Sequence, residues 1–176
     1  TVRSATLTAP DGRVIADVNE NNLHLVGYSI PISGTFSLSE LQDHLHSIPE
    51  QPDAIPYVNS YYNRNWGFCL TNEVRESLTE GDYTVAIDTT IEPGSLTYGE
   101  LVIPGESTAE IFISSYVCHP SLANNELSGP VVSSSLARHI LAQPNRHYTY
   151  RFAFVPETIG ALTYSSLNRA HLRDNV

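Results

Sequence analysis

The sequence predicts an α/β protein whose first half is rich in β-structure, and three observations support this prediction. Short segments of alternating apolar and polar residues, separated by proline and glycine turns, recur over the first ninety residues. After Gly94, strand-like apolar segments alternate with longer segments of helical period, which is typical of an α/β layer. With 41% hydrophobic and 16% charged residues among 176, the chain can bury a normal core in one domain or two small ones.

A hairpin is expected at the start of the chain. Residues 2–8 and 13–18 alternate on either side of residues 10–12, which have the Pro-Asp-Gly sequence of a tight turn. Further strands are predicted over residues 23–30 and 83–91, and a short helix over residues 73–78.

Another short helix should follow Ser37, because Glu40 stands three residues later at the spacing of a capping box. This helix should end near Pro49. Its histidines, His44 and His46, are expected to face solvent.

The second half alternates between strands and helices. Strands are predicted over residues 96–103, 110–118 and 148–155, and helices over residues 127–141 and 159–172. The first of these helices should bury an apolar stripe of Val131, Leu136 and Ile140. Strands of this kind are expected to run parallel, joined by right-handed crossovers.

The segment 57–68 is densely aromatic, and two interpretations stay open. Its rings could form a stacking platform for sugars or bases, or they could pin a long connection to the fold.

Composition excludes several classes of function. Nineteen acidic residues against nine basic ones give a formal charge of −10, so a nucleic-acid partner is not expected. All basic residues are arginine, which excludes any mechanism that needs a lysine nucleophile. Cys69 and Cys118 are too few for a disulfide scaffold and are interpreted as ordinary buried thiols.

No apolar run approaches the length of a membrane span, and the first residues show neither a basic region nor an apolar signal core. We therefore expect a cytoplasmic protein without a membrane partner. The chain begins at Thr1 and contains no methionine, so it is expected to be processed or to be a segment of something longer.

Two polar clusters follow predicted strands, where the ligand site of an open α/β sheet lies. In residues 118–129, His119 could bind a metal, and Asn125 or Glu126 could add an oxygen ligand; in residues 156–160, Glu157 could take a proton from water. The alternatives are structural. His119 could be a hydrogen-bonded loop residue, the asparagines could cap the next helix, and Glu157 could serve a helix dipole.

The motifs Cys-His-Pro-Ser, Asn-Glu-Leu-Ser-Gly and Phe-Val-Pro-Glu-Thr-Ile-Gly resemble those of a bacterial aminopeptidase-like family. This family belongs to the zinc aminopeptidase and glutamate carboxypeptidase superfamily. Four earlier segments resemble the small domain that the family inserts into its core: Asn-Leu-His at 22–24, Gln-Pro-Asp-Ala-Ile-Pro-Tyr at 51–57, Ser-Tyr-Tyr at 60–62 and Trp-Gly-Phe-Cys at 66–69. The resemblance implies a partial aminopeptidase-like α/β sheet core over residues 94–176, preceded by a β-rich inserted accessory domain over residues 1–93.

The resemblance also implies the roles of single residues. His119 matches the first metal-binding histidine, Asn125 the metal-bridging aspartate, Glu157 the general base and Thr158 a further ligand glutamate. Because Asn125 and Thr158 depart from the pattern, one weakly held zinc near His119 is expected rather than a pair.

The implied function is zinc-dependent hydrolysis of N-terminal peptide or amide bonds, with a peptide or amino-acyl substrate, by a fragment of a longer chain. The alternative is a non-catalytic binding or assembly domain on the same fold, in contact through residues 57–68. Assembly into a homo-oligomer stays open.

Overall fold

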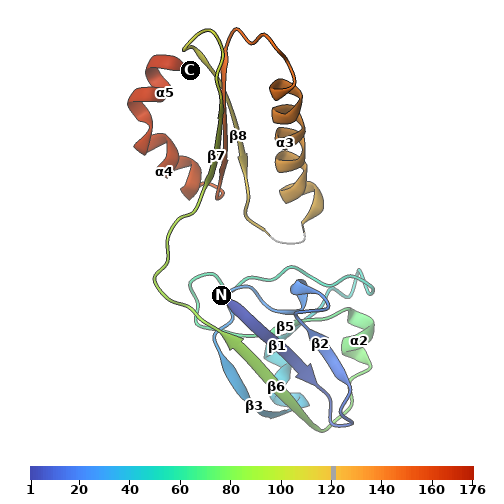
Figure 1. Cartoon of the computed structure of the whole chain (residues 1–176). Helices are drawn as coiled ribbons and strands as arrows, with labels where there is room; N and C mark the ends of the chain where they lie inside the picture. Colours follow the sequence, from blue (N-terminus) through green and yellow to red (C-terminus); the bar gives the residue numbers. More distant parts are fainter. Residues whose placement is uncertain (120–121) are drawn as a thin grey trace. The chain divides into compact units, whose positions relative to one another are not determined.

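The computed structural model describes residues 1–119 and 122–176, and these divide into two compact units, Thr1–Pro93 and Gly94–Val176 (Figure 1). Each unit contains strands, helices and its own buried hydrophobic clusters. The predicted α/β class is confirmed.

Unit 1, residues 1–93, is built on an antiparallel sheet in the order β2-β1-β6-β3. Its strands are β1 (Val2–Thr8), β2 (Val14–Asp17), β3 (Ile32–Ser37) and β6 (Asp82–Thr89). The predicted hairpin of β1 and β2 is confirmed. Alternate residues of β6 are buried, as expected for a sheet with one face on the core.

The prediction of a strand over residues 23–30 is wrong. The Asn21 side chain accepts a hydrogen bond from Leu23 and starts a 3-10 helix, η1 (Asn22–His24), which competes with an extended conformation. In this sheet, the strand that the sequence analysis missed is β3, which pairs with β6.

The capping box is confirmed, because the Ser37 side chain accepts from the Glu40 amide and Glu40 accepts from the Ser37 amide. The helix is shorter than predicted. The remaining elements here are α1 (Leu38–Leu41), η2 (Gln42–His44), the parallel strands β4 (Leu45–His46) and β5 (Phe68–Cys69), and α2 (Asn72–Glu76).

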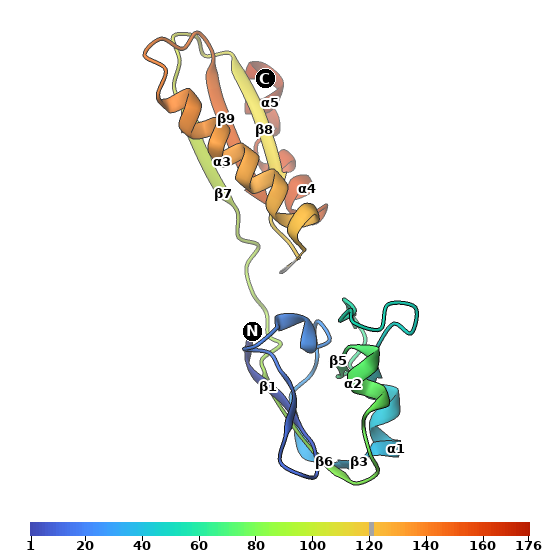
Figure 2. The same ribbon diagram turned by 90° about the vertical axis from the view of Figure 1, so that its right-hand side faces the viewer.

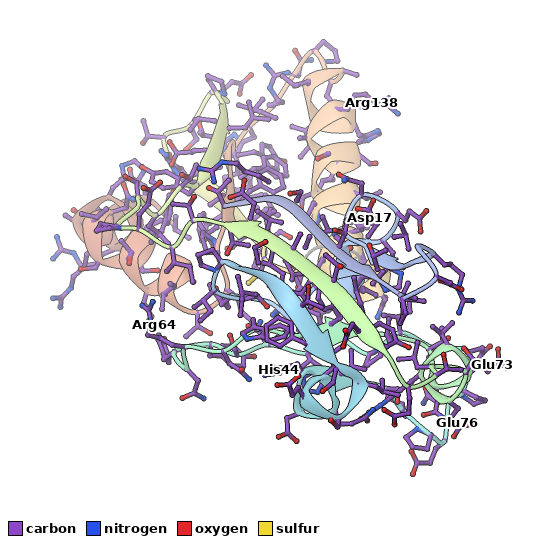
Figure 3. All side chains as sticks on the ribbon, turned by 90° about the horizontal axis from the view of Figure 1, so that it is seen from below. Asp17, His44, Arg64, Glu73, Glu76 and Arg138 are labelled. Carbon is purple, nitrogen blue, oxygen red and sulfur yellow. The ribbon has the colours of Figure 1, made fainter. Side chains whose placement is uncertain are left out.

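His44 and His46 do not face solvent as expected. The His44 ring stacks on Trp66 with centroids 3.7 Å apart, and its Nδ1 atom lies 2.8 Å from the Trp66 carbonyl (Figure 3 labels His44). A Cβ atom at Gly67 would stand 2.7 Å from the His44 carbonyl, so the chains can approach this closely only at glycine. Burial lowers the pKa of His46.

The two ends of the aromatic segment differ in burial, and the packing interpretation holds for the carboxyl end. Trp66 and Phe68 are 6% and 0% exposed and belong to the core of unit 1. Tyr57, Tyr61 and Tyr62 leave their rings exposed. The segment is therefore pinned at its carboxyl end and presents rings at its amino end.

Unit 2, residues 94–176, is a three-stranded sheet between helices. The sheet order is β7-β9-β8, with β7 (Gly99–Ile103), β8 (Glu110–Tyr116) and β9 (Thr149–Val155). β8 and β9 run parallel, as predicted, whereas β7 is antiparallel to β9. Helix α3 (Ser128–Leu141) covers one face, and α4 (Ile159–Leu167) and α5 (Arg169–Asn175) cover the other (Figures 1 and 2).

The buried stripe of α3 differs from the predicted one. Val131 and Leu136 are exposed, while Ser133, Ala137 and Ile140 are buried against the sheet. Of the predicted stripe only Ile140 is buried, and two of the three buried side chains, Ser133 and Ala137, are small. Among the described residues, no helix combines the length and apolarity that crossing a bilayer requires.

A charged network joins the sheet of unit 2 to α4 and α5. Arg151 on β9 makes a bidentate pair with Glu110 on β8, at 2.7 and 2.9 Å, and also contacts Glu100 on β7 at 2.9 Å. Tyr164 of α4 donates to Glu100, and His171 of α5 lies 3.0 Å from Glu110. The Glu110 and Arg151 side chains are 5% and 13% exposed, so the bidentate pair at the centre of this network is largely buried.

We expect Glu110→Gln to destabilise unit 2 by about 2 kcal/mol, because Arg151 loses its bidentate charge partner and keeps only Glu100. Native-state hydrogen exchange of the β9 amides measures this loss. The matched control is Asp88→Asn, which breaks the exposed Arg3–Asp88 pair and should cost less than about 1 kcal/mol. Equal costs for the two variants would contradict the network.

The difference in stability between the wild type and Glu110→Gln should depend on pH. Hydrogen bonds from Arg151 hold the pKa of Glu110 below its usual 4.5, although burial opposes them. The stabilisation is therefore present above pH 4.5 and is lost as the pH falls through the lowered pKa. The difference between the wild type and Glu110→Gln should shrink in acid; a difference that grows would contradict this assignment.

Candidate functional site

The carboxyl ends of β8 and β9 lie side by side, because the two strands are parallel neighbours. Their register pairs Tyr116 with Val155, and the Val117 amide still donates to the Val155 carbonyl at 2.9 Å. Directly after this pairing, one chain segment carries Cys118 and His119, and the other carries Glu157. The parallel pairing thus brings two segments about forty residues apart to one edge.

Three side chains meet at this edge. One ligand atom each from Cys118, His119 and Glu157 lie within 4.8 Å of one another. Cys118 and Glu157 are exposed and His119 is half-buried. A thiol, an imidazole and a carboxylate are the side chains that bind zinc in proteins.

The interpretation of both cysteines as buried thiols is wrong for Cys118 and right for Cys69. Burial raises the pKa of Cys69 to about 12, which makes that thiol inert. The signal that could have separated them is position, because Cys118 immediately follows a strand and precedes a candidate ligand.

Glu126 lies behind His119. Its carboxylate accepts a hydrogen bond from the His119 Nδ1 atom at 2.6 Å and another from the Cys118 amide at 2.8 Å. Glu126 is only 5% exposed, and this burial, the largest single influence, raises its pKa. The hydrogen bonds from residues 118 and 119 outweigh it and hold the pKa below its usual value.

The ionised carboxylate of Glu126 can only accept, so the Nδ1 atom of His119 carries the proton and the lone pair lies on Nε2. A carboxylate on the far nitrogen of a histidine is the arrangement that orients metal-binding histidines in proteins. The structure therefore places Glu126 as the partner of a candidate ligand and not within the three-residue cluster.

A π-helical turn, η3 (Ala123–Leu127), points Glu126 inward; it is the one buried residue of the five. Such turns are rare and occur often at functional sites. Asn125, the residue before Glu126 in that turn, is exposed, and its Oδ1 atom accepts from the Tyr116 hydroxyl at 3.1 Å. Asn125 thus lies beside the cluster but outside it.

Tyr116 was not predicted as a site residue. Burial raises its pKa above the usual 10, and the negative charges of Glu126, Glu157 and Cys118 add to the effect. Its hydroxyl therefore stays protonated next to the cluster and can donate a hydrogen bond.

Glu157 is held by a strained turn. The Ile159 amide donates to the Glu157 carbonyl at 2.6 Å, and Thr158 between them has φ 53° and ψ −72°. This is a γ-turn of the rare kind with positive φ, which is costly for a β-branched residue. Strain of this kind concentrates where a side chain must be aimed.

The structural alternatives for the asparagines and for His119 have different outcomes. The N-cap of α3 is Leu127 and has no side-chain cap, so the asparagines do not cap that helix. His119 is hydrogen-bonded to Glu126, as the loop interpretation also expects. Pro120 and Ser121 of the predicted cluster lie outside the described residues.

Comparisons with known proteins agree along the whole chain. Residues 1–90 match the model of a family described as a domain of unknown function, DUF2172. A Clostridium acetobutylicum protein, named as a candidate polysaccharide biosynthesis protein with an aminopeptidase-like domain, is 44% identical over 173 residues. That alignment covers 98% of this chain and 40% of the relative.

A crystal structure from Clostridium acetobutylicum, of a protein named as a candidate peptidase, is similar in fold and in sequence. Its TM-score is 0.94 at 43% identity, over 100% of this chain and 41% of that one. The chain thus spans about two fifths of the length of both relatives. The fold is that of a peptidase-like α/β protein.

We expect Thr158→Gly to leave the fold intact and to stabilise it by about 1 kcal/mol relative to Thr158→Ala, because glycine adopts positive φ without strain. Thermal unfolding of the two variants measures the difference. Thr158 is exposed, so neither variant removes a buried contact. A Thr158→Gly variant less stable than Thr158→Ala would contradict the γ-turn.

Proposed function

We propose that this chain, which belongs to the DUF2172 family, is part of a zinc-dependent, aminopeptidase-like hydrolase of N-terminal peptide or amide bonds. The observation that carries the proposal is the cluster of Cys118, His119 and Glu157 at the shared strand ends, with Glu126 behind the histidine. The names of both relatives support a peptidase-like function.

The cluster fits zinc in chemistry and in size. Ligand atoms about 2.0 to 2.3 Å from a tetrahedral zinc are roughly 3.5 Å apart. The ligand atoms of Cys118 and His119 lie within 4.8 Å of each other, so small side-chain rotations would bring both to one zinc, and the Glu157 carboxylate lies within the same distance. A bound zinc would polarise the substrate carbonyl and make water more acidic.

Each residue has a distinct part in this proposal. Cys118 and His119 hold the metal, and Glu126 fixes the ring orientation of His119. Glu157 takes a proton from the attacking water and delivers it to the leaving amine. The Tyr116 hydroxyl, kept protonated, donates a hydrogen bond beside them.

Two positions favour one metal over two. Asn125 carries no charge with which to bridge two cations, and its oxygen already accepts from Tyr116. Thr158 offers a poor ligand atom in place of a carboxylate. Glu126 is the remaining carboxylate of the predicted ligand set, and it is engaged by His119 and Cys118.

The division of the chain belongs to the same proposal. Residues 94–176 would be the first half of the catalytic core, and residues 1–93 an accessory domain inserted into it. The alternative remains a non-catalytic binding or assembly domain on this fold, because fold alone does not determine function. A peptide or amino-acyl group is the proposed substrate class.

Zinc binding tests the cluster directly. With a chelating dye as competitor, the chain should take up one zinc weakly enough to lose it on dialysis, since a catalytic zinc normally has three protein ligands and a water. His119→Ala and Cys118→Ser should each weaken binding at least about tenfold. The control His147→Ala removes an exposed histidine of the same unit and should change nothing.

Zinc that binds equally well to His119→Ala would mean that the site lies elsewhere. Activity is the second measurement: the chain alone should not hydrolyse amino-acid amides, whereas a chain extended to the length of the relatives should. In the extended chain, Glu157→Gln should abolish turnover. An extended chain with neither zinc nor hydrolysis would favour the binding-domain alternative.

A further inference from the structure

We propose that unit 1 binds a neutral saccharide on the exposed ring pair of Tyr28 and Tyr61 with Tyr57, which Asn59 ties to Tyr61, called here the tyrosine surface. The inference is independent of the cluster in unit 2 and of any hydrolytic activity.

The exposed rings of this unit are of one chemical kind. Between residues 15 and 90, the exposed large hydrophobic side chains are Tyr28, Tyr57, Tyr61 and Tyr62, at 62%, 38%, 62% and 101% exposure. No exposed aliphatic side chain accompanies them. Each ring combines an apolar face with a hydroxyl, whereas the centre of a protein interface is more apolar.

Two of these tyrosines occupy turn positions that normally require glycine or asparagine. Tyr28 has φ 63° in the turn closed by the Ser29 amide and the Val26 carbonyl at 3.1 Å. Tyr61 has φ 47° in the turn closed by the Asn63 amide and the Ser60 carbonyl at 3.0 Å. Each such conformation costs a bulky residue about 1 to 3 kcal/mol.

The strain places the two rings together. Tyr28 and Tyr61 have centroids 6.5 Å apart and an interplanar angle of 31°, so they form a tilted pair. Both remain more than half exposed, so the pair buries too little to offset the strain by packing alone. A strained backbone conformation that packing does not compensate is expected at a binding surface.

The two turns are locked to each other. The Gly27 amide donates to the Val58 carbonyl at 2.9 Å, and the Ser60 amide donates to the Gly27 carbonyl at 3.0 Å. A Cβ atom at Gly27 would lie 3.0 Å from the Asn59 amide group, so glycine permits the approach. Asn59 itself donates to the Tyr57 hydroxyl and accepts from the Tyr61 amide. The tyrosine surface is therefore organised before a ligand arrives, which reduces the entropic cost of binding.

The charge of unit 1 selects against anionic ligands. Residues 1–93 contain thirteen acidic residues and four arginines. Nucleic acids and acidic glycans are repelled by such a surface. Arg64, labelled in Figure 3, is the one arginine in the loop of residues 57–65.

A neutral saccharide fits the chemistry of the tyrosine surface. One face of a pyranose ring carries C–H bonds with partial positive charge, which stack on the negative face of an aromatic ring. The rim of the sugar carries hydroxyls, and the side-chain amides of Asn63 and Asn65 in the same loop belong to a type that can both donate to and accept from them.

The test is calorimetric titration of the whole chain with five neutral hexasaccharides: maltohexaose, cellohexaose, xylohexaose, mannohexaose and chitohexaose. At least one should bind saturably, with a Kd between about 10 μM and 1 mM. Tyr61→Asn and Tyr28→Asn should each weaken that binding at least tenfold. Tyr61→Phe should retain most of it, because the ring face is kept.

Stability separates binding from a structural role. Asparagine tolerates positive φ, so Tyr28→Asn and Tyr61→Asn should unfold at the same or a higher temperature than the wild type while binding is lost. The control Tyr148→Ala removes an exposed tyrosine of unit 2 and should leave saccharide binding unchanged.

Three results would overturn the proposal. They are the absence of saturable binding by all five hexasaccharides up to 5 mM, binding that survives the double variant Tyr28→Asn/Tyr61→Asn, and tighter binding of a single-stranded oligothymidylate than of any saccharide. Failure of the zinc experiment would not affect this one, since its residues belong to the other unit.

Discussion

The parallel pairing of β8 with β9 is the constraint on which the candidate site depends. Parallel strands end at the same edge of a sheet, so two segments separated by a whole helix deliver their next residues to one place. The crossover helix α3 needs close packing on the strands, which its small buried residues allow. Arg151 and Glu110, bridging the same two strands nearer their amino ends, fix the register that the site requires.

Glu126 shows how the chain holds a buried charge beside the candidate cluster. A carboxylate at 5% exposure is costly to bury, and hydrogen bonds from residues 118 and 119 together with the charge of His119 compensate this cost. The widened turn of η3 is what lets a residue so close to the strand end point back toward His119. The π-helical turn and the hydrogen bonds to Glu126 thus act together to hold this carboxylate beside His119.

Much of the fold and half of the site follow from sequence pattern. Alternation and turn residues predict β1, β2 and β6, and the strand-end argument finds His119 and Glu157, because both rest on local periodicity. The prediction of a strand over residues 23–30 was wrong because the Asn21 side chain favours a 3-10 helix there. The prediction of the buried face of α3 was wrong because small side chains, rather than the large apolar ones expected, make up most of its buried residues. The π-turn, the γ-turn at Thr158 and the exposure of Cys118 depend on tertiary contacts and carry no pattern that a single sequence displays.

The order β7-β9-β8 leaves β8 at an edge of its sheet among the described residues. The amide and carbonyl groups along an edge attract any extended chain, and Ile111 adds an exposed apolar side chain to this strand. Any extended chain that paired with β8 would lie along the strand whose carboxyl end positions Cys118 and His119, so a partner at this edge would be a neighbour of the candidate site.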